Sequence, residues 1–123
     1  MIKIKHRVNS IDELKKLNIN FGVEVDIRSQ GSRLIISHDP FLKGILFKDW
    51  IKHYKHNLLI LNVKEEGLER YLIDYMKDYN INDYFFLDQS FPFIIKYSSH
   101  CEKRSAIRFS EYEDINTCLN VNL

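Results

Sequence analysis

The sequence predicts an α/β fold in which a parallel β-sheet is joined by right-handed helical crossovers. Extended apolar segments alternate with amphipathic helical segments along most of the chain. The segment 57–64 (NLLILNVK) is almost continuously apolar, which is typical of a strand buried on both faces of a parallel sheet. Polar residues follow the strands, where α/β folds place their functional groups.

Length and composition indicate one globular domain spanning residues 1–123. The chain has 45% hydrophobic and 13% aromatic residues and a formal net charge of +1. A near-neutral charge argues against nucleic-acid binding, which needs a basic surface. Two cysteines without metal-type spacing favour the reducing cytoplasm. We expect no transmembrane segment, because no apolar run reaches the ~18–20 residues that span a bilayer.

Five principal strands are predicted from β-branched and aromatic content and from the turn residues around them. They are expected at 2–6, 21–28, 57–64, 84–88 and 105–109, with a short extended run at 33–37. The run at 33–37 follows a turn at Gln30-Gly31-Ser32.

The helices are predicted from capping residues and from apolar side chains at helical spacing. Ser10 and Glu13 form a capping box at the start of the first helix, which carries Ile11, Leu14 and Leu17. Further helices are expected at 47–54, 68–79 and 91–97, and in the tail from Tyr112.

Two carboxylates, Glu24 and Asp26, share one face of the second predicted strand. Residues at i and i+2 of a strand lie about 7 Å apart, and two carboxylates there repel unless a positive charge lies between them. A hard divalent cation such as Mg²⁺ or Ca²⁺ meets that need. A structural ion network with Lys64 and Arg108 is the alternative.

Two histidines, His6 and His38, lie at the ends of extended segments near this acidic pair. One such histidine could accept a proton while the other donates one. The alternative interpretation is that each is an ordinary packed or half-exposed histidine without a catalytic role. The other three histidines lie in predicted helices or loops and receive no role.

The motifs His6-Arg7, 22–26 (GVEVD) and 31–40 (GSRLIISHDP) resemble the N-terminal motifs of the glycerophosphodiester phosphodiesterase family. That family has His-Arg-Gly, Glu-x-Asp and His-Asp in this order. The resemblance continues more weakly at Asn62-Val63-Lys64, at Ser90-Phe91 and at Arg108.

The resemblance implies parallel β/α units of a TIM-type (β/α) barrel with about five strands present, and therefore a partial barrel or a fragment, because a closed barrel needs at least ~200 residues. It implies a phosphoric diester hydrolase of lipid metabolism that uses Mg²⁺ or Ca²⁺. Glu24, Asp26 and Asn62 would bind the metal, and His6 and His38 would be the catalytic acid and base. Arg7 and Lys64 would hold the substrate phosphate.

The sequence departs from the family pattern at two of these motifs. Val8 follows His-Arg where the family has Gly, and Asn62 stands where the family has a metal-binding Glu. An amide oxygen brings no charge, so a weaker metal site or loss of the metal is expected. Two alternatives therefore remain, a non-catalytic relative that binds a phosphate or lipid head group and an unrelated open α/β domain. Open strand edges would favour self-association.

Overall fold

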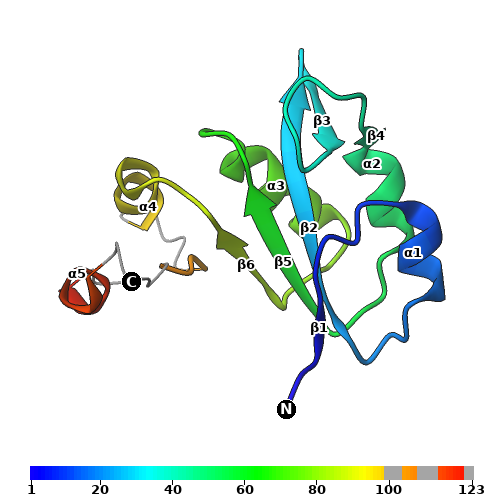
Figure 1. The fold of residues 1–123 in the computed structure, drawn as a ribbon, viewed down its shortest axis with the longest axis horizontal. Helices are drawn as coiled ribbons and strands as arrows, with labels where there is room; N and C mark the ends of the chain where they lie inside the picture. The colour runs from blue at the N-terminus through cyan, green and yellow to red at the C-terminus, as the bar shows by residue number, and fades with distance from the viewer. Residues whose placement is uncertain (99–103, 108–113, 121–123) are drawn as a thin grey trace.

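The structure, a computed structural model, describes residues 1–98, 104–107 and 114–120. The described residues form one open, six-stranded sheet (Figure 1). Its strands are β1 (Ile4–Lys5), β2 (Gly22–Gln30), β3 (Arg33–Ile36), β4 (Ile45–Leu46), β5 (Leu58–Val63) and β6 (Tyr84–Leu87). The path runs β4-β3-β2-β5-β6, and β1 pairs with β2 beside this path.

The described part of the chain also contains five α-helices and one 3₁₀ helix, of which the last two follow β6. They are α1 (Ile11–Lys16), α2 (Phe47–Trp50), the 3₁₀ helix η1 (Ile51–His53), α3 (Glu69–Asp78), α4 (Phe91–Ser98) and α5 (Ile115–Asn120). Ser10 caps α1 as predicted, because its hydroxyl accepts a hydrogen bond of 3.2 Å from the Glu13 amide. In Figure 1, α4 and α5 lie beyond β6, on the opposite side of the sheet from α1 and α2.

The predicted barrel units are wrong, because the sheet is open and mixed. β1, β5 and β6 join it through parallel pairings, but β2 with β3 and β3 with β4 are antiparallel. The cause is local. Gly31, with φ +61°, turns the chain straight back, so that β3 lies along the end of β2 instead of following a helical crossover.

β4 was not predicted, and it extends the hairpin by a second antiparallel pairing with β3. Gly44 permits this return, since a Cβ there would overlap the backbone carbonyl of Ile36. The chain therefore reaches the helical segment at Phe47 by way of a short sheet edge. That segment is also shorter than predicted, with four α-helical residues before η1 begins.

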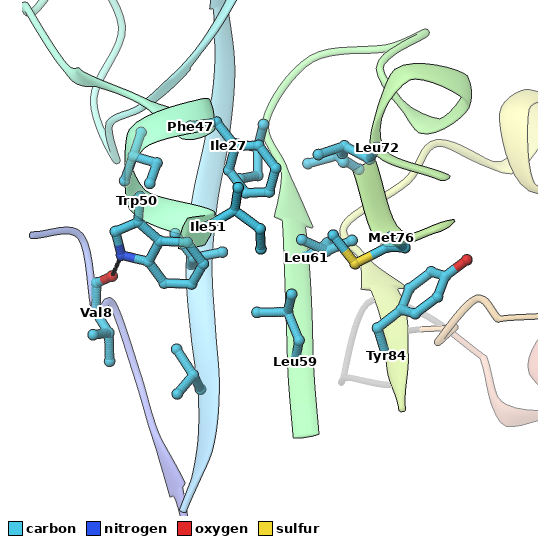
Figure 2. Packing of buried hydrophobic residues seen from close by; sticks show 14 of the residues in the cluster. Val8, Ile27, Phe47, Trp50, Ile51, Leu59, Leu61, Leu72, Met76 and Tyr84 are labelled. Carbon is cyan, nitrogen blue, oxygen red and sulfur yellow. Dashed lines mark hydrogen bonds between the residues drawn. The ribbon is translucent and has the colours of Figure 1, made fainter. Parts of the chain in front are cut away.

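The hydrophobic core lies on one face of β2, β5 and β6, under α2, η1 and α3 (Figure 2). Phe47, Trp50 and Ile51 pack toward Ile27 and the strand β5, and Trp50 is fully buried. Its indole N–H donates a hydrogen bond of 3.0 Å to the carbonyl oxygen of Val8. This bond ties the segment after β1 to the core and positions the residues that precede it.

The fifth predicted strand, 105–109, falls only partly on described residues. Ser105 forms a single parallel bridge with Phe86, and residues 108–109 lie outside the described part of the chain. Arg108, predicted near the site, is among them. No helix in the described part of the chain has both the length and the apolar content for a bilayer crossing.

Candidate functional site

Strand alternation separates the candidate site from the core. Val23, Val25 and Ile27 belong to the core cluster, so Glu24 and Asp26 project from the opposite face of β2. Asn62 lies directly opposite Asp26 on β5. Glu24, Asp26 and Asn62 are buried, at 6%, 0% and 5% exposure. Buried carboxylates need partners, and their partners define the cluster.

Glu24 has a donor at each carboxylate oxygen. Its Oε1 accepts a hydrogen bond of 3.0 Å from Asn62 Nδ2, and its Oε2 contacts His6 Nδ1. The His6 ring is largely exposed, whereas Glu24 is buried. His6 is held beside Glu24 because β1 pairs with β2 and the Val8 amide then donates 2.9 Å to the Glu24 carbonyl.

Asp26 is held by Asn9 and Lys64. Asn9 Nδ2 donates 2.8 Å to Asp26 Oδ2, and the Asp26 amide donates 3.1 Å to Asn9 Oδ1. Lys64 Nζ lies 3.6 Å from Asp26 Oδ1 and 3.2 Å from Asp88 Oδ2. One ammonium group is therefore shared between a carboxylate on β2 and one that follows β6.

Two buried oxygens at this point, Asp26 Oδ1 and Asn62 Oδ1, have no hydrogen-bond partner. Lys64 faces the first of them from 3.6 Å, outside hydrogen-bonding distance. Lys64 is also shared with Asp88, so Glu24 and Asp26 together have less than one full cation while His6 is neutral. A hard divalent cation fits this donor set, because carboxylate and amide oxygens are its preferred ligands.

The charge of this cluster is nonetheless lower than that of most divalent sites. Among the described residues, no three His, Cys, Asp or Glu side chains gather into a metal-binding group. A cation would therefore be held by Asp26, Asn62 and, through its shared oxygens, Glu24. This is the set predicted from the sequence.

His38, the second predicted catalytic histidine, lies outside the hydrogen-bonded cluster. Its Nδ1 is 3.0 Å from Asp39 Oδ1. Its backbone carbonyl accepts from Arg28 Nε and Nη2, at 3.3 and 2.8 Å. The preceding residue, Ser37, donates its amide to the Asp26 carbonyl at 3.2 Å, so His38 follows directly after a residue bonded to Asp26.

Arg7, predicted to hold phosphate, is not drawn into the cluster. Its side chain is exposed and forms no hydrogen bond or ion pair within the described residues. Its backbone has φ 54°, and its carbonyl accepts from the Asn9 amide at 2.9 Å. This tight turn brings the Asn9 side chain to Asp26. The turn forms even though Val8 stands where the phosphodiesterase family has glycine.

Asn9 and Arg28 were not singled out by sequence reasoning. Arg28 could have been found, since it lies at i+2 from Asp26 and shares its strand face. Asn9 carried no such signal, because its contact depends on the turn at Arg7. Comparisons of the chain with protein families, with curated proteins and with solved structures found no match. The function is therefore argued from the site.

Proposed function

We propose that this chain hydrolyses a phosphodiester, with a divalent cation as cofactor and histidine as the general acid and base. The observation that carries the proposal is that two side-chain networks, His6–Glu24–Asn62 and Asp26–Lys64, lie side by side, because Asp26 and Asn62 are paired across β2 and β5. The resemblance to glycerophosphodiester phosphodiesterases suggests a glycerol-linked substrate. The proposal concerns the reaction alone, because the fold is an open mixed sheet and not the barrel of that family.

The two histidines share a feature that suits proton transfer. His6 Nδ1 faces Glu24 and His38 Nδ1 faces Asp39. An ionised carboxylate can only accept, so each Nδ1 carries its proton and leaves Nε2 as the free nitrogen. A neutral Nε2 takes a proton from an attacking hydroxyl, and a charged imidazole returns one to the leaving oxygen.

Asp26, Asn62 and Glu24 would hold the cation, which when bound would polarise a phosphoryl oxygen and neutralise developing charge. Lys64 supports the same chemistry from the protein side. The Lys64 side chain is 19% exposed, so its Nζ can donate to a phosphate oxygen while it remains near Asp26. Arg7 is exposed and free to approach the same phosphate.

A second candidate is a non-catalytic protein that binds a phosphate or lipid head group. It is favoured by the Asn62–Glu24 bond, because an amide N–H there satisfies a carboxylate oxygen without a metal. In this case His6 and Asn62 satisfy both oxygens of Glu24, and Asn9 bonds one oxygen of Asp26 while the charge of Lys64 lies 3.6 Å from the other. The two candidates differ in their response to a cation.

The test measures the thermal midpoint of unfolding with Mg²⁺ or Ca²⁺ in the millimolar range. A cation bound only by the folded chain must raise the midpoint. Asp26→Asn should remove this rise, whereas Asp12→Asn, a matched change at an exposed i,i+4 ion pair, should keep it. If neither cation changes the midpoint of the wild-type protein, the metal-dependent hydrolase is excluded and the non-catalytic binding protein is the remaining candidate. If the midpoint rises, choline release from glycerophosphocholine in the presence of that cation would show catalysis, and its absence would show binding alone.

A cytoplasmic location, self-association through strand edges and the absence of a nucleic-acid partner remain predictions from the sequence. The small-molecule or lipid head-group phosphodiester remains the proposed partner.

A further inference from the structure

A separate cavity of about 520 Å³ lies at the end of β2, beyond the acidic cluster. Its lining contains the polar or charged residues Arg28, Ser29, Gln30 and Glu65 and the apolar residues Ile35, Pro40, Phe41 and Leu42. Arg28 and Ile35 are opposite each other in the β2–β3 pairing, so a cation and an apolar side chain meet on one sheet face.

Arg28 is a half-buried cation without a carboxylate partner. Its Nε and Nη2 donate to the same acceptor, the His38 carbonyl, which fixes the plane of the guanidinium group. It forms no ion pair within the described residues. Its other N–H groups are therefore available, and a planar guanidinium binds carboxylate or phosphate oxygens in pairs.

Glu65 lines the same cavity but does not neutralise Arg28. Its Oε1 accepts from the Ser29 amide at 3.1 Å and its Oε2 from the Ser29 hydroxyl at 2.5 Å. Both Glu65 oxygens are thus bound at Ser29 and not at Arg28, so the negative charge of Glu65 remains in the cavity lining while the guanidinium group has no ion-pair partner within the described residues. Arg28 can therefore pair with an anionic ligand from outside the described chain.

Two of the apolar residues that line the cavity are exposed. Phe41 is fully exposed, Leu42 is 57% exposed, and Phe41 has φ 64°. A bulky residue in this backbone region is strained by about 1–3 kcal/mol and gains nothing here from packing in the core. An exposed Phe-Leu pair beside an unpaired cation matches a ligand with an apolar chain and an anionic head.

We propose that this cavity binds an anionic amphiphile, with its carboxylate or phosphate head on Arg28 and its alkyl chain against Ile35, Phe41 and Leu42. The site does not depend on the acidic cluster or on a cation. It lies two residues further along the same face of β2 than Asp26. An amphiphile bound there would place its head next to that cluster.

The test is calorimetric titration without divalent cation, using n-octyl phosphate, octanoate, n-octyl glucoside and inorganic phosphate. Octyl phosphate is expected to bind at least tenfold more tightly than the glucoside, which lacks the charge, and than phosphate, which lacks the chain. The ratio of the affinities for octanoate and octyl phosphate shows whether the site prefers a carboxylate or a phosphate head. Equal affinity for octyl phosphate and octyl glucoside would overturn the proposal.

Two pairs of variants locate the site. Arg28→Gln should reduce octyl phosphate binding to the level of the glucoside, whereas Arg33→Gln, a matched change at an exposed arginine outside this cavity, should not. Phe41→Ser should weaken the binding of both octyl ligands at least threefold, and Ile19→Ser, at an exposed apolar residue outside this cavity, should weaken neither. Phe41 is exposed, so its variant folds even if Arg28→Gln does not. Wild-type affinity in Phe41→Ser would refute the site.

Discussion

Asp26 and Asn62 lie opposite each other on neighbouring parallel strands, and each has one buried side-chain oxygen without a hydrogen-bond partner. Unpartnered buried oxygens are costly, by about 1–3 kcal/mol each. These two oxygens belong to residues paired across β2 and β5, and Lys64 Nζ lies 3.6 Å from the Asp26 oxygen, so they form the chemical centre of the candidate site.

Asn62→Asp tests whether a cation occupies that space. A third carboxylate beside Glu24 and Asp26 should lower the thermal midpoint without cation, because like charges are then buried together. It should enlarge the rise produced by Ca²⁺, because cation affinity increases with ligand charge.

The control is Asn20→Asp, the same change at an exposed position. It should leave the midpoint and the cation response unchanged. If Asn62→Asp lowers the midpoint and Ca²⁺ restores nothing, the oxygens do not face a cation site.

His6→Ala and His38→Ala test the assignment of acid and base. If the chain hydrolyses phosphodiesters, each change should reduce kcat by about 10²–10⁴-fold, the usual contribution of a positioned acid or base. Each should also remove one limb of the pH profile, which a purely structural effect would leave in place.

His53→Ala serves as the control, since His53 lies in η1 and forms no hydrogen bond or ion pair with Glu24, Asp26 or Asn62 among the described residues. Wild-type activity in His38→Ala, with loss in His6→Ala, would assign proton transfer to the cluster histidine alone. Wild-type activity in both would discard the histidine mechanism.

Asn9→Ala tests the pair of hydrogen bonds between Asn9 and Asp26, which the turn at Arg7 makes possible. The change removes two hydrogen bonds and leaves the buried Asp26 carboxylate and amide with one partner fewer each. We expect a loss of about 1–3 kcal/mol in the free energy of unfolding, measured by urea denaturation.

Asn18→Ala is the matched control. Asn18 is exposed and accepts one local bond from the Asn20 amide, so its loss should cost less than about 0.5 kcal/mol. Equal costs for the two variants would show that the Asn9 bonds contribute little to the folded state.

Gly44→Ala tests why the sheet continues into β4. A Cβ at Gly44 would overlap the Ile36 carbonyl, so the β3–β4 pairing must shift, at a cost of about 3 kcal/mol. Gly31→Ala has open space around the new Cβ and should cost only the backbone strain of φ +61°, about 1–2 kcal/mol. Urea denaturation measures both, and an equal or larger loss in Gly31→Ala would contradict the close-contact explanation.

Local pattern was sufficient for most elements of this protein. The capping box at Ser10, the apolar run of β5 and the helical stripe of α3 depend on neighbours within a few residues, and all three lie where the sequence predicted them. The same alternation placed Glu24 and Asp26 on one face, because side-chain direction in a strand has a period of two.

The tertiary structure decided what those elements do together. The local turn at Gly31 starts a β2–β3 hairpin, but its combination with the parallel pairings of β1, β5 and β6 into one sheet is tertiary, and it replaces the expected barrel units by an open mixed sheet. The partners of Asp26 could not be predicted from its sequence neighbours either, since Asn9 and Lys64 lie 17 and 38 residues away in the chain. A sequence pattern specifies which face a side chain occupies, but only the packed chain brings its partners to that face.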